Sequence, residues 1–250
     1  MIGQARLFLC ALQFLTRLPT PPLKPYPPDA VARSAVYYPV VGWIVGGLAA
    51  LVLLAADRLW PPLIGAALAT IAAVLITGGF HEDGLADAAD GLIGGQTPER
   101  RLEIMKDSRI GAYGTIALWS ILTVRTLALA ALPPPQAALA LILIHGAARA
   151  LPAVLMSLQP YAGDPGRSKL GPAQVRPHEA LIAVALGFGP LALAPPTHAA
   201  LAFGLAALAA GGVAFAARRL IGGWTGDVLG AMEQVAEAAL ALGLSANLTP

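Results

Sequence analysis

The acidic segment of residues 81–91, HEDGLADAADG, holds the side chains best suited to chemistry. Asp83, Asp87 and Asp90 are spaced i, i+4 and i+7, so a helix would place them on one face. Carboxylates on one face repel each other unless a cation lies among them, and hard oxygen ligands suit Mg²⁺ or Mn²⁺. The spacing therefore predicts a metal site, with a solvated acidic face as the alternative. His81 points elsewhere on this helix, which is as consistent with a helix-end hydrogen bond as with a ligand.

A basic cluster follows in EIMKDSRIGAYG, residues 103–114, directly before an apolar stretch. Lys106, Asp107 and Arg109 lie within four residues of one another there. A metal ion together with Lys or Arg neutralises the charge on transferred and leaving phosphates. The cluster is therefore consistent with pyrophosphate chemistry. The alternative is simple electrostatic anchoring at the membrane surface.

Two arginines lie inside apolar stretches. Arg125 interrupts the run 111–131, and Arg149 follows His145 by one helical turn. A buried arginine in a membrane segment must be paired or face a watery cavity. Snorkelling towards the interface explains Arg149 well enough, but Arg125 lies deeper and needs a partner.

The last apolar segment also begins with polar residues, GGWTGDVLGAMEQVAE at 222–237. Asp227, Gln234 and Glu237 share one helix face there. We expect this face to lie level with the acidic helix. Together the clusters predict a membrane phosphotransferase with a Mg²⁺ site open to the cytoplasm.

The elements that must position these residues are membrane helices. The chain has 250 residues, 57% of them hydrophobic and only 12% charged, about half the usual charged share of soluble domains. Spans need about 20 mostly apolar residues. We therefore predict an all-α, polytopic integral membrane bundle with about seven spans and an N-terminal interfacial helix. The predicted spans are 35–56, 59–80, 111–131, 126–148, 180–194, 199–217 and 225–247.

The positive charges indicate the orientation. With the N-terminus in the cytoplasm, the segments 1–34, 81–110, 159–179 and 218–224 carry thirteen of the sixteen Lys and Arg residues. Only Arg58 falls on the opposite side. We therefore expect one membrane domain, 1–250, in the bacterial cytoplasmic (inner) membrane. The acidic and basic loop 81–110, and with it the active site, would face the cytoplasm.

Several of these strings together are similar to one known family. GGFHEDGLADAADGLIGG at 78–95 and LEIMKDSRIGAYG at 102–114 resemble the cobalamin synthases, the adenosylcobinamide-GDP ribazoletransferases. FLTRLP at 14–19, YYPVVGWIVG at 37–46 and GGWTGDVLGA at 222–231 match in the same order. One departure is Glu82, where an apolar residue such as Leu is expected.

The resemblance implies a Mg²⁺-dependent reaction. A ribose hydroxyl of α-ribazole, or of its 5′-phosphate, attacks the cobinamide-linked phosphate of adenosylcobinamide-GDP, so GMP leaves and adenosylcobalamin, or its 5′-phosphate, forms. We expect those substrates and the lipid bilayer as partners, no nucleic acid, and a homo-oligomer as one arrangement of the chain. The expected site residues are, for catalysis, Asp87, Asp90, Lys106 and Arg109; for substrate, His81, Asp107, Arg149, Thr225 and Glu237; and for metal, Asp83, Asp87, Asp90 and Asp227.

Two other functions fit parts of the pattern. CDP-alcohol phosphotransferases use a similar acidic motif on membrane helices, but this chain has Asp87 where that motif has its arginine. A transporter of a corrinoid or a divalent ion is the alternative from another class. Transporter sites usually lie near the midplane between repeat-related spans, whereas most acids here fall outside the predicted spans.

Overall fold

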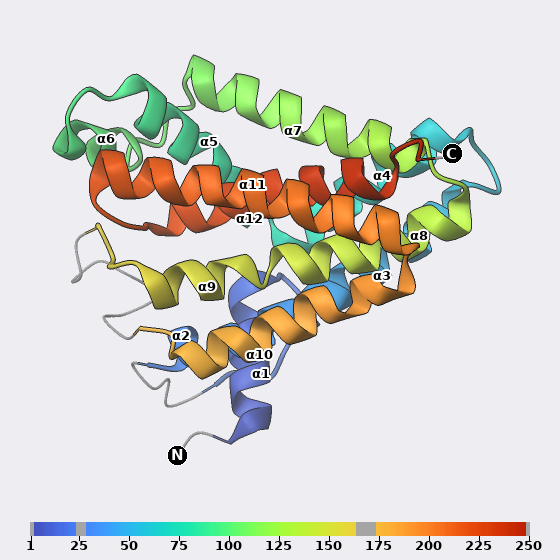
Figure 1. The fold of residues 1–250 in the computed structure, drawn as a ribbon, viewed down its shortest axis with the longest axis horizontal. Helices are drawn as coiled ribbons and strands as arrows, with labels where there is room; N and C mark the ends of the chain where they lie inside the picture. Colours follow the sequence, from blue (N-terminus) through green and yellow to red (C-terminus); the bar gives the residue numbers. More distant parts are fainter. Residues whose placement is uncertain (1–2, 24–28, 164–173, 249–250) are drawn as a thin grey trace.

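The computed structural model describes residues 3–23, 29–163 and 174–248, and within them every regular element longer than an isolated bridge is a helix (Figure 1). The helices are α1 (Gln4–Leu15), α2 (Ala30–Ser34), η1 (Ala35–Tyr37), α3 (Tyr38–Ala56), α4 (Pro62–Thr77), α5 (Phe80–Gly94), α6 (Pro98–Ile104), α7 (Ala112–Ala130), α8 (Pro134–Ala148), α9 (Leu151–Leu158), α10 (Pro177–Phe188), η3 (Gly189–Leu193), α11 (Pro196–Ile221) and α12 (Gly226–Leu244). The prediction of an all-α fold is confirmed. Lys24, Arg167 and Lys169, which belong to the expected cytoplasmic charges, lie outside the described residues.

Proline marks where many of these helices begin. Pro62, Pro98, Pro134, Pro177 and Pro196 each stand at the first position of a helix. The first backbone N–H groups of a helix have no internal partner, and the fixed φ of proline matches helical geometry. These prolines therefore mark boundaries between helices. A stretch of sequence that is continuously apolar can be divided into two helices at such a proline.

Four helical segments are long and apolar enough to cross a membrane. They are 30–56, 112–130, 134–158 and 196–221, and a bent pair, 62–77 with 80–94, would make a fifth. A membrane helical bundle is therefore confirmed, whereas the count of seven spans is not. The predicted span 126–148 is divided at residues 131–133, between α7 and α8. α10 has only 12 residues, and α12 carries three carboxylates.

A sharp bend separates α4 from α5. The two helix axes meet at 90°. Gly78 and Gly79 both adopt left-handed backbone conformations at the bend, with φ of +71° and +70°. Residues with a Cβ rarely take this conformation, so two glycines in succession permit a turn this tight. Because α5 alone carries four carboxylates, we interpret it as an arm at the charged end of the bundle and not as part of a span.

The helix α12 forms the centre of the bundle. It packs against α5, α7, α8 and α11, and nearly all of its residues are buried. α1 runs across the direction of the long helices (Figure 1). Its position at a membrane interface stays a prediction. The segment 81–110, predicted as a loop between spans that contains the acidic helix, holds α5 and α6. α5 packs against α12, and α6 packs against α5.

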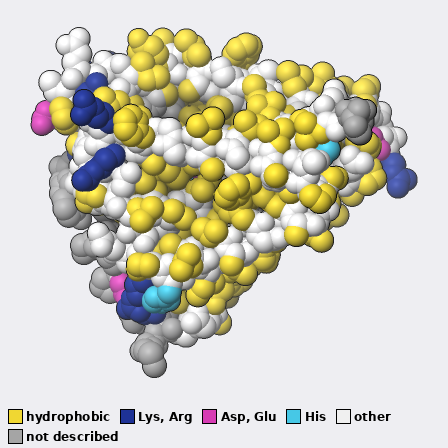
Figure 2. All heavy atoms as spheres, in the orientation of Figure 1, with side chains coloured by type: hydrophobic (Ala, Val, Ile, Leu, Met, Phe, Trp, Pro, Cys, Tyr) yellow, Lys and Arg dark blue, Asp and Glu magenta, His cyan; other side chains and the backbone are white. Residues whose placement is uncertain are grey.

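The surface matches a molecule embedded in lipid. Hydrophobic side chains cover the middle of the molecule in Figure 2, whereas Lys, Arg, Asp and Glu appear near its ends. Large exposed apolar residues such as Leu75, Trp119 and Leu208 lie on the candidate spans and on α4. Lipid is as apolar as these side chains, so their exposure on a membrane helix is not costly.

Candidate active site at the charged end of the bundle

The crossing of α5 over α12 brings the acidic segments together. A Cβ added at Gly84 would lie 3.1 Å from the Cα of Asp227, and one added at Gly230 would lie 3.2 Å from the Cα of Gly84. A Cβ at either position would be tighter than an ordinary contact, so glycine at both positions favours this close approach of the backbones. As a result, the carboxylates of α5 and the first turn of α12 share one region, as the sequence predicted.

The carboxylates of this region interact strongly. The pKa of Asp87 is raised to about 7, first by partial burial and then by the negative charges of Asp83, Asp227 and Asp90. A cation bound nearby would stabilise the ionised form of such a carboxylate, because it offsets the negative charges of the neighbours. Among the described residues, no three His, Cys, Asp or Glu side chains lie close enough to hold a metal ion by themselves. Mg²⁺ is usually bound by one or two carboxylates together with substrate phosphates, so an oxygen-rich cluster of this kind fits a shared magnesium ion.

Asp90 is held by the start of α7. Its Oδ2 accepts a hydrogen bond from the backbone N of Gly111 at 2.6 Å, and its Oδ1 accepts one from Gly114 at 2.9 Å. These N–H groups have no partner inside their own helix. The arrangement favours an anchoring role for Asp90, which sequence reasoning missed. The two glycines three residues apart were the available signal, because the carboxylate occupies the space that their side chains would need. The predicted catalytic and metal roles of Asp90 stay predictions.

The basic cluster lies on the exposed segment between α6 and α7. Arg109 is paired with Asp107, with 2.7 Å between Nη2 and Oδ2. The hydrogen bonds from Arg109 lower the pKa of Asp107 to about 2 and raise the pKa of Arg109 itself. Lys106 is exposed beside them. Since Gly111 is bonded to Asp90, this segment is attached to the acidic helix, so the structure brings the two predicted clusters to the same end of the bundle.

A group of buried charges lies deeper, around Glu237. The carboxylate of Glu237 accepts from Arg149 at 2.9 Å, lies 2.5 Å from the Nδ1 of His145 and is paired with Arg125. Arg125 also donates to the amide oxygen of Gln234 at 3.2 Å. The deep arginine thus has the partner that its position required.

Glu233 extends the group towards α5. Its Oε2 lies 2.5 Å from the Nε2 of His81, and its Oε1 lies 2.9 Å from the Nη2 of Arg149. Glu82 lies 4.0 Å from the Nη2 of Arg125, which gives this unexpected acid a partner. We call the following eight residues the buried ion network: His81, Glu82, Arg125, His145, Arg149, Glu233, Gln234 and Glu237.

The buried ion network includes three of the residues predicted to bind substrate, His81, Arg149 and Glu237. Glu237 is fully buried, and its carboxylate joins α7, α8 and α12. Sequence reasoning missed Glu233, although its spacing of four residues from Glu237 in an apolar helix was a usable signal. The substrate-binding roles of all three residues stay predictions.

Thr225 begins α12. Its Oγ1 accepts from the backbone N of Val228 at 3.3 Å, which caps the helix, and lies 3.3 Å from the Oδ2 of Asp227. An N-cap threonine fixes the direction of the first turn. Thr225 therefore orients the carboxylate that α12 contributes to the acidic region, while its predicted contact with substrate stays a prediction.

Comparison with known proteins identifies the family. The family model described as cobalamin-5-phosphate synthase matches residues 7–245. The chain belongs to this family. A relative from Leptothrix cholodnii, an adenosylcobinamide-GDP ribazoletransferase, is 45% identical over 99% of this chain and 98% of its own length. Relatives of the same name from Polaromonas naphthalenivorans and Bradyrhizobium diazoefficiens are 41% and 45% identical, over 99% and 93% of this chain and 100% and 90% of their own lengths.

The family resemblance read from the acidic and basic motifs is thus confirmed over nearly the whole chain. No solved structure matches it. The residues that the family model matches extend from α1 to the end of α12, so they include the acidic region, the basic cluster and the buried ion network.

Proposed function

We propose that this chain is an adenosylcobinamide-GDP ribazoletransferase, acting in the final step of cobalamin synthesis. The observation that carries the proposal is its 45% identity, over 99% of its length, to a relative of that name. The convergence of acidic and basic residues at one end of a membrane bundle supports it, because a diphosphate substrate needs both. Family membership favours this reaction over a CDP-alcohol phosphotransferase and over a transporter.

In the proposed reaction, a ribose hydroxyl oxygen of α-ribazole or its 5′-phosphate bonds to the cobinamide-linked phosphorus. The bond from that phosphorus to the bridging oxygen breaks, GMP leaves with the electron pair, and the hydroxyl proton is released. Lys106 and Arg109 would neutralise charge on the diphosphate. Their exposure beside α5 suits an incoming soluble nucleotide.

Magnesium belongs to the proposal through the acidic region. One or two of Asp83, Asp87 and Asp227 would hold Mg²⁺ together with the diphosphate, to which the ion would supply positive charge when bound. Partial burial first, and the negative charges of Asp83 and Asp227 next, raise the pKa of Asp87, and a cation at this place would offset both effects. Asp90, bonded to two backbone N–H groups, would hold α5 against α7 while the others bind the metal.

We also propose that the chain lies in the bacterial cytoplasmic membrane with this end facing the cytoplasm. The excess of Lys and Arg in the segments at this end supports the orientation. Nucleotide substrates are cytoplasmic, so a site open to that side can be supplied with them.

The experiment is an assay of the purified chain in lipid nanodiscs. Adenosylcobinamide-GDP, α-ribazole and Mg²⁺ are supplied, and GMP and the corrinoid product are separated by chromatography. We expect equal amounts of GMP and adenosylcobalamin. Absence of both from a well-folded preparation would overturn the proposed function.

The metal assignment is tested separately by titrating Mg²⁺. Asp83→Asn, Asp87→Asn and Asp227→Asn should each raise the half-saturating Mg²⁺ concentration. Glu99→Gln, an exposed acid on α6, is the matched control and should leave it unchanged. If all three aspartate variants behave like the control, the assignment is wrong.

A further inference from the structure

The basic cluster lies in a segment that is attached at both ends. We call residues 105–111, which join α6 to α7, the basic segment. Within residues 96–113, all of which the structure describes, Met105 is the only buried residue, at 5% exposure. Lys106 and Arg109, by contrast, are exposed. Met105 is therefore an apolar anchor within an exposed, charged stretch.

The side chain of Met105 occupies a space that Gly91 leaves open. A Cβ added at Gly91 of α5 would lie 2.5 Å from the Cγ of Met105 and 2.8 Å from the carbonyl oxygen of Arg101. A side chain at position 91 would therefore force Met105 and the backbone of α6 to move away from α5. The glycine that follows Asp90 in the acidic motif thus has a structural reason, which is the packing of Met105.

Met105 also contacts the start of α12. Its Sδ lies 3.9 Å from the Oγ1 of Thr225, and that hydroxyl oxygen lies 3.3 Å from the Oδ2 of Asp227. One side chain thus separates Met105 from a carboxylate of the acidic region. At the other end of the basic segment, Gly111 donates its backbone N–H to Asp90. Both ends of the basic segment are therefore attached to the acidic region.

Hydrogen bonds continue from this anchor to the cations. The backbone N of Lys106 donates to the carbonyl oxygen of Glu103 at 3.1 Å, so the chain leaves α6 in a tight turn. The carboxylate of Asp107 then accepts from the backbone N of Arg109 at 3.1 Å and from its guanidinium at 2.7 Å. The position of Met105 therefore determines where the positive charges of Lys106 and Arg109 lie.

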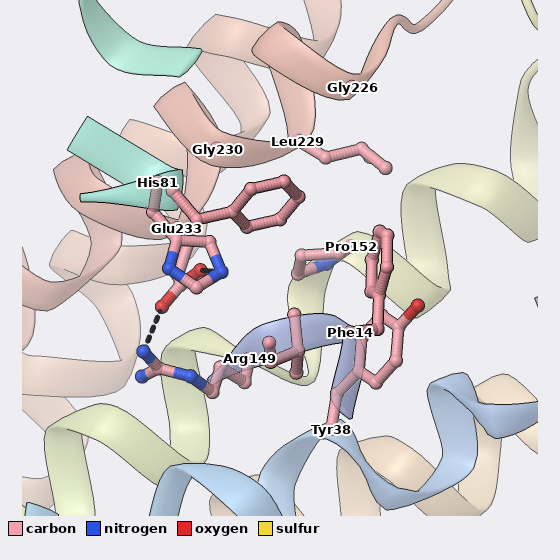
Figure 3. A pocket seen from close by; sticks show the side chains of 11 residues that line it. Phe14, Tyr38, His81, Arg149, Pro152, Gly226, Leu229, Gly230 and Glu233 are labelled. Carbon is pink, nitrogen blue, oxygen red and sulfur yellow. Dashed lines mark ion pairs between the residues drawn. The ribbon is translucent and has the colours of Figure 1, made fainter. Parts of the chain in front are cut away.

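The helices beneath the basic segment are themselves joined. Glu233 of α12 is paired with His81 of α5 and with Arg149 in the buried ion network (Figure 3). The backbones of α5 and α12 also approach each other closely where two glycines meet. Because α5 and α12 are held together in this way, we expect a change at Met105 to move the exposed basic segment and not the acidic region.

We propose that Met105 is a positioning residue for the diphosphate of adenosylcobinamide-GDP. Its buried side chain fixes the basic segment against α5 and Thr225, so the charges of Lys106 and Arg109 are in place before the substrate binds. Pre-organised charges of this kind need no rearrangement when the diphosphate arrives. The inference rests on the proposed function and adds to it a residue that acts through these two cations.

The test compares the KM values of the two substrates in Met105→Ala. Displacement of the cations should raise the KM for adenosylcobinamide-GDP by between about fivefold and a hundredfold, because a misplacement of about 1 Å can have an effect of that size. The KM for α-ribazole should stay within about twofold. Met105→Leu keeps a buried apolar side chain of similar volume, so it should restore the KM for adenosylcobinamide-GDP.

The matched control is Met156→Ala, which removes another buried methionine, on α9. Both methionine variants should lower Tm, but Met156→Ala should leave both KM values within about twofold. A second variant acts on Met105 from α5, because Gly91→Ala should displace it and raise the KM for adenosylcobinamide-GDP selectively. Gly94→Ala is the control for this variant, since a Cβ there meets no atom of another element closer than 3.7 Å.

A combined variant distinguishes positioning from general stability. In a chain that carries Lys106→Ala and Arg109→Ala, the cations are absent, so adding Met105→Ala should raise the KM for adenosylcobinamide-GDP by less than about twofold. Equilibrium dialysis of radiolabelled adenosylcobinamide-GDP, without α-ribazole, should give the same order of affinities. An equal effect of Met105→Ala with and without the cations, or an equal rise in the KM of both substrates, would overturn the proposal.

The two proposals fail in different ways. If the wild-type chain releases no GMP, the proposed function fails. If the wild-type chain is active but Met105→Ala has the same KM values as Met156→Ala, only the role of Met105 fails.

Discussion

Removal of the Glu237 carboxylate is the sharpest test of the buried ion network. Glu237→Ala leaves Arg125 and Arg149 without their shared partner, although both remain buried. Breaking a buried ion pair by deleting one partner typically costs about 3–5 kcal/mol, because an uncompensated charge remains. In a chain of this size, each kcal/mol lowers Tm by about 2–4 °C. The expected loss in Tm is therefore about 6–20 °C.

The measurement is thermal unfolding of the purified protein in one detergent, followed by tryptophan fluorescence at a fixed scan rate. The matched control is Glu103→Ala, because Glu103 is also paired with an arginine, Arg100 at 2.7 Å, but both are exposed. Exposed pairs contribute about 0–1 kcal/mol, so this variant should lose less than about 4 °C. If Glu237→Ala lost no more than Glu103→Ala, the network would not stabilise the bundle and the reasoning would be refuted.

Three other predictions concern the acidic region. Asp90→Ala removes two hydrogen bonds to a charged acceptor and should cost about 3–6 kcal/mol, measured by denaturant unfolding; a loss below 1 kcal/mol would contradict the anchoring role. Gly84→Ala places a Cβ 3.1 Å from the backbone of Asp227, so it should destabilise the chain by about 1–3 kcal/mol and raise the half-saturating Mg²⁺ concentration. The pKa of Asp87 is about 7 without metal, so protons compete with Mg²⁺ below that pH. The half-saturating Mg²⁺ concentration should therefore be higher at pH 6 than at pH 8, and Asp87→Asn should flatten this dependence.

Hydropathy correctly predicted a membrane bundle, but it did not predict where one helix ends and the next begins. The run 126–148 reads as one span, yet it is divided before Pro134, where a proline begins α8. The acids of α12 are the opposite case. By composition they exclude α12 as a lipid-facing span, but inside the bundle Arg125 and Arg149 neutralise Glu233 and Glu237. Composition alone does not distinguish a helix surrounded by lipid from one surrounded by other helices.

The candidate site was predictable only in part, because spacing within one helix does not show which other helices it contacts. The spacing of Asp83, Asp87 and Asp90 predicted a shared helix face, but their partners came from other helices. Asp90 bonds to the start of α7, whereas Asp87 lies within the electrostatic influence of Asp227 on α12. Glu233 looked like an ordinary acid in an apolar run until its contacts with His81 and Arg149 were seen.

By itself, the sequence determined what depends on local spacing and on charge. The all-α class, the membrane environment, the sorting of cations and the family all follow from residue types and their order. Only the tertiary structure decided which charges meet. Two left-handed glycines fold α5 back by 90°, and Gly84 and Gly230 let it touch α12. Such contacts join residues more than a hundred positions apart, and no periodicity within one helix carries that information.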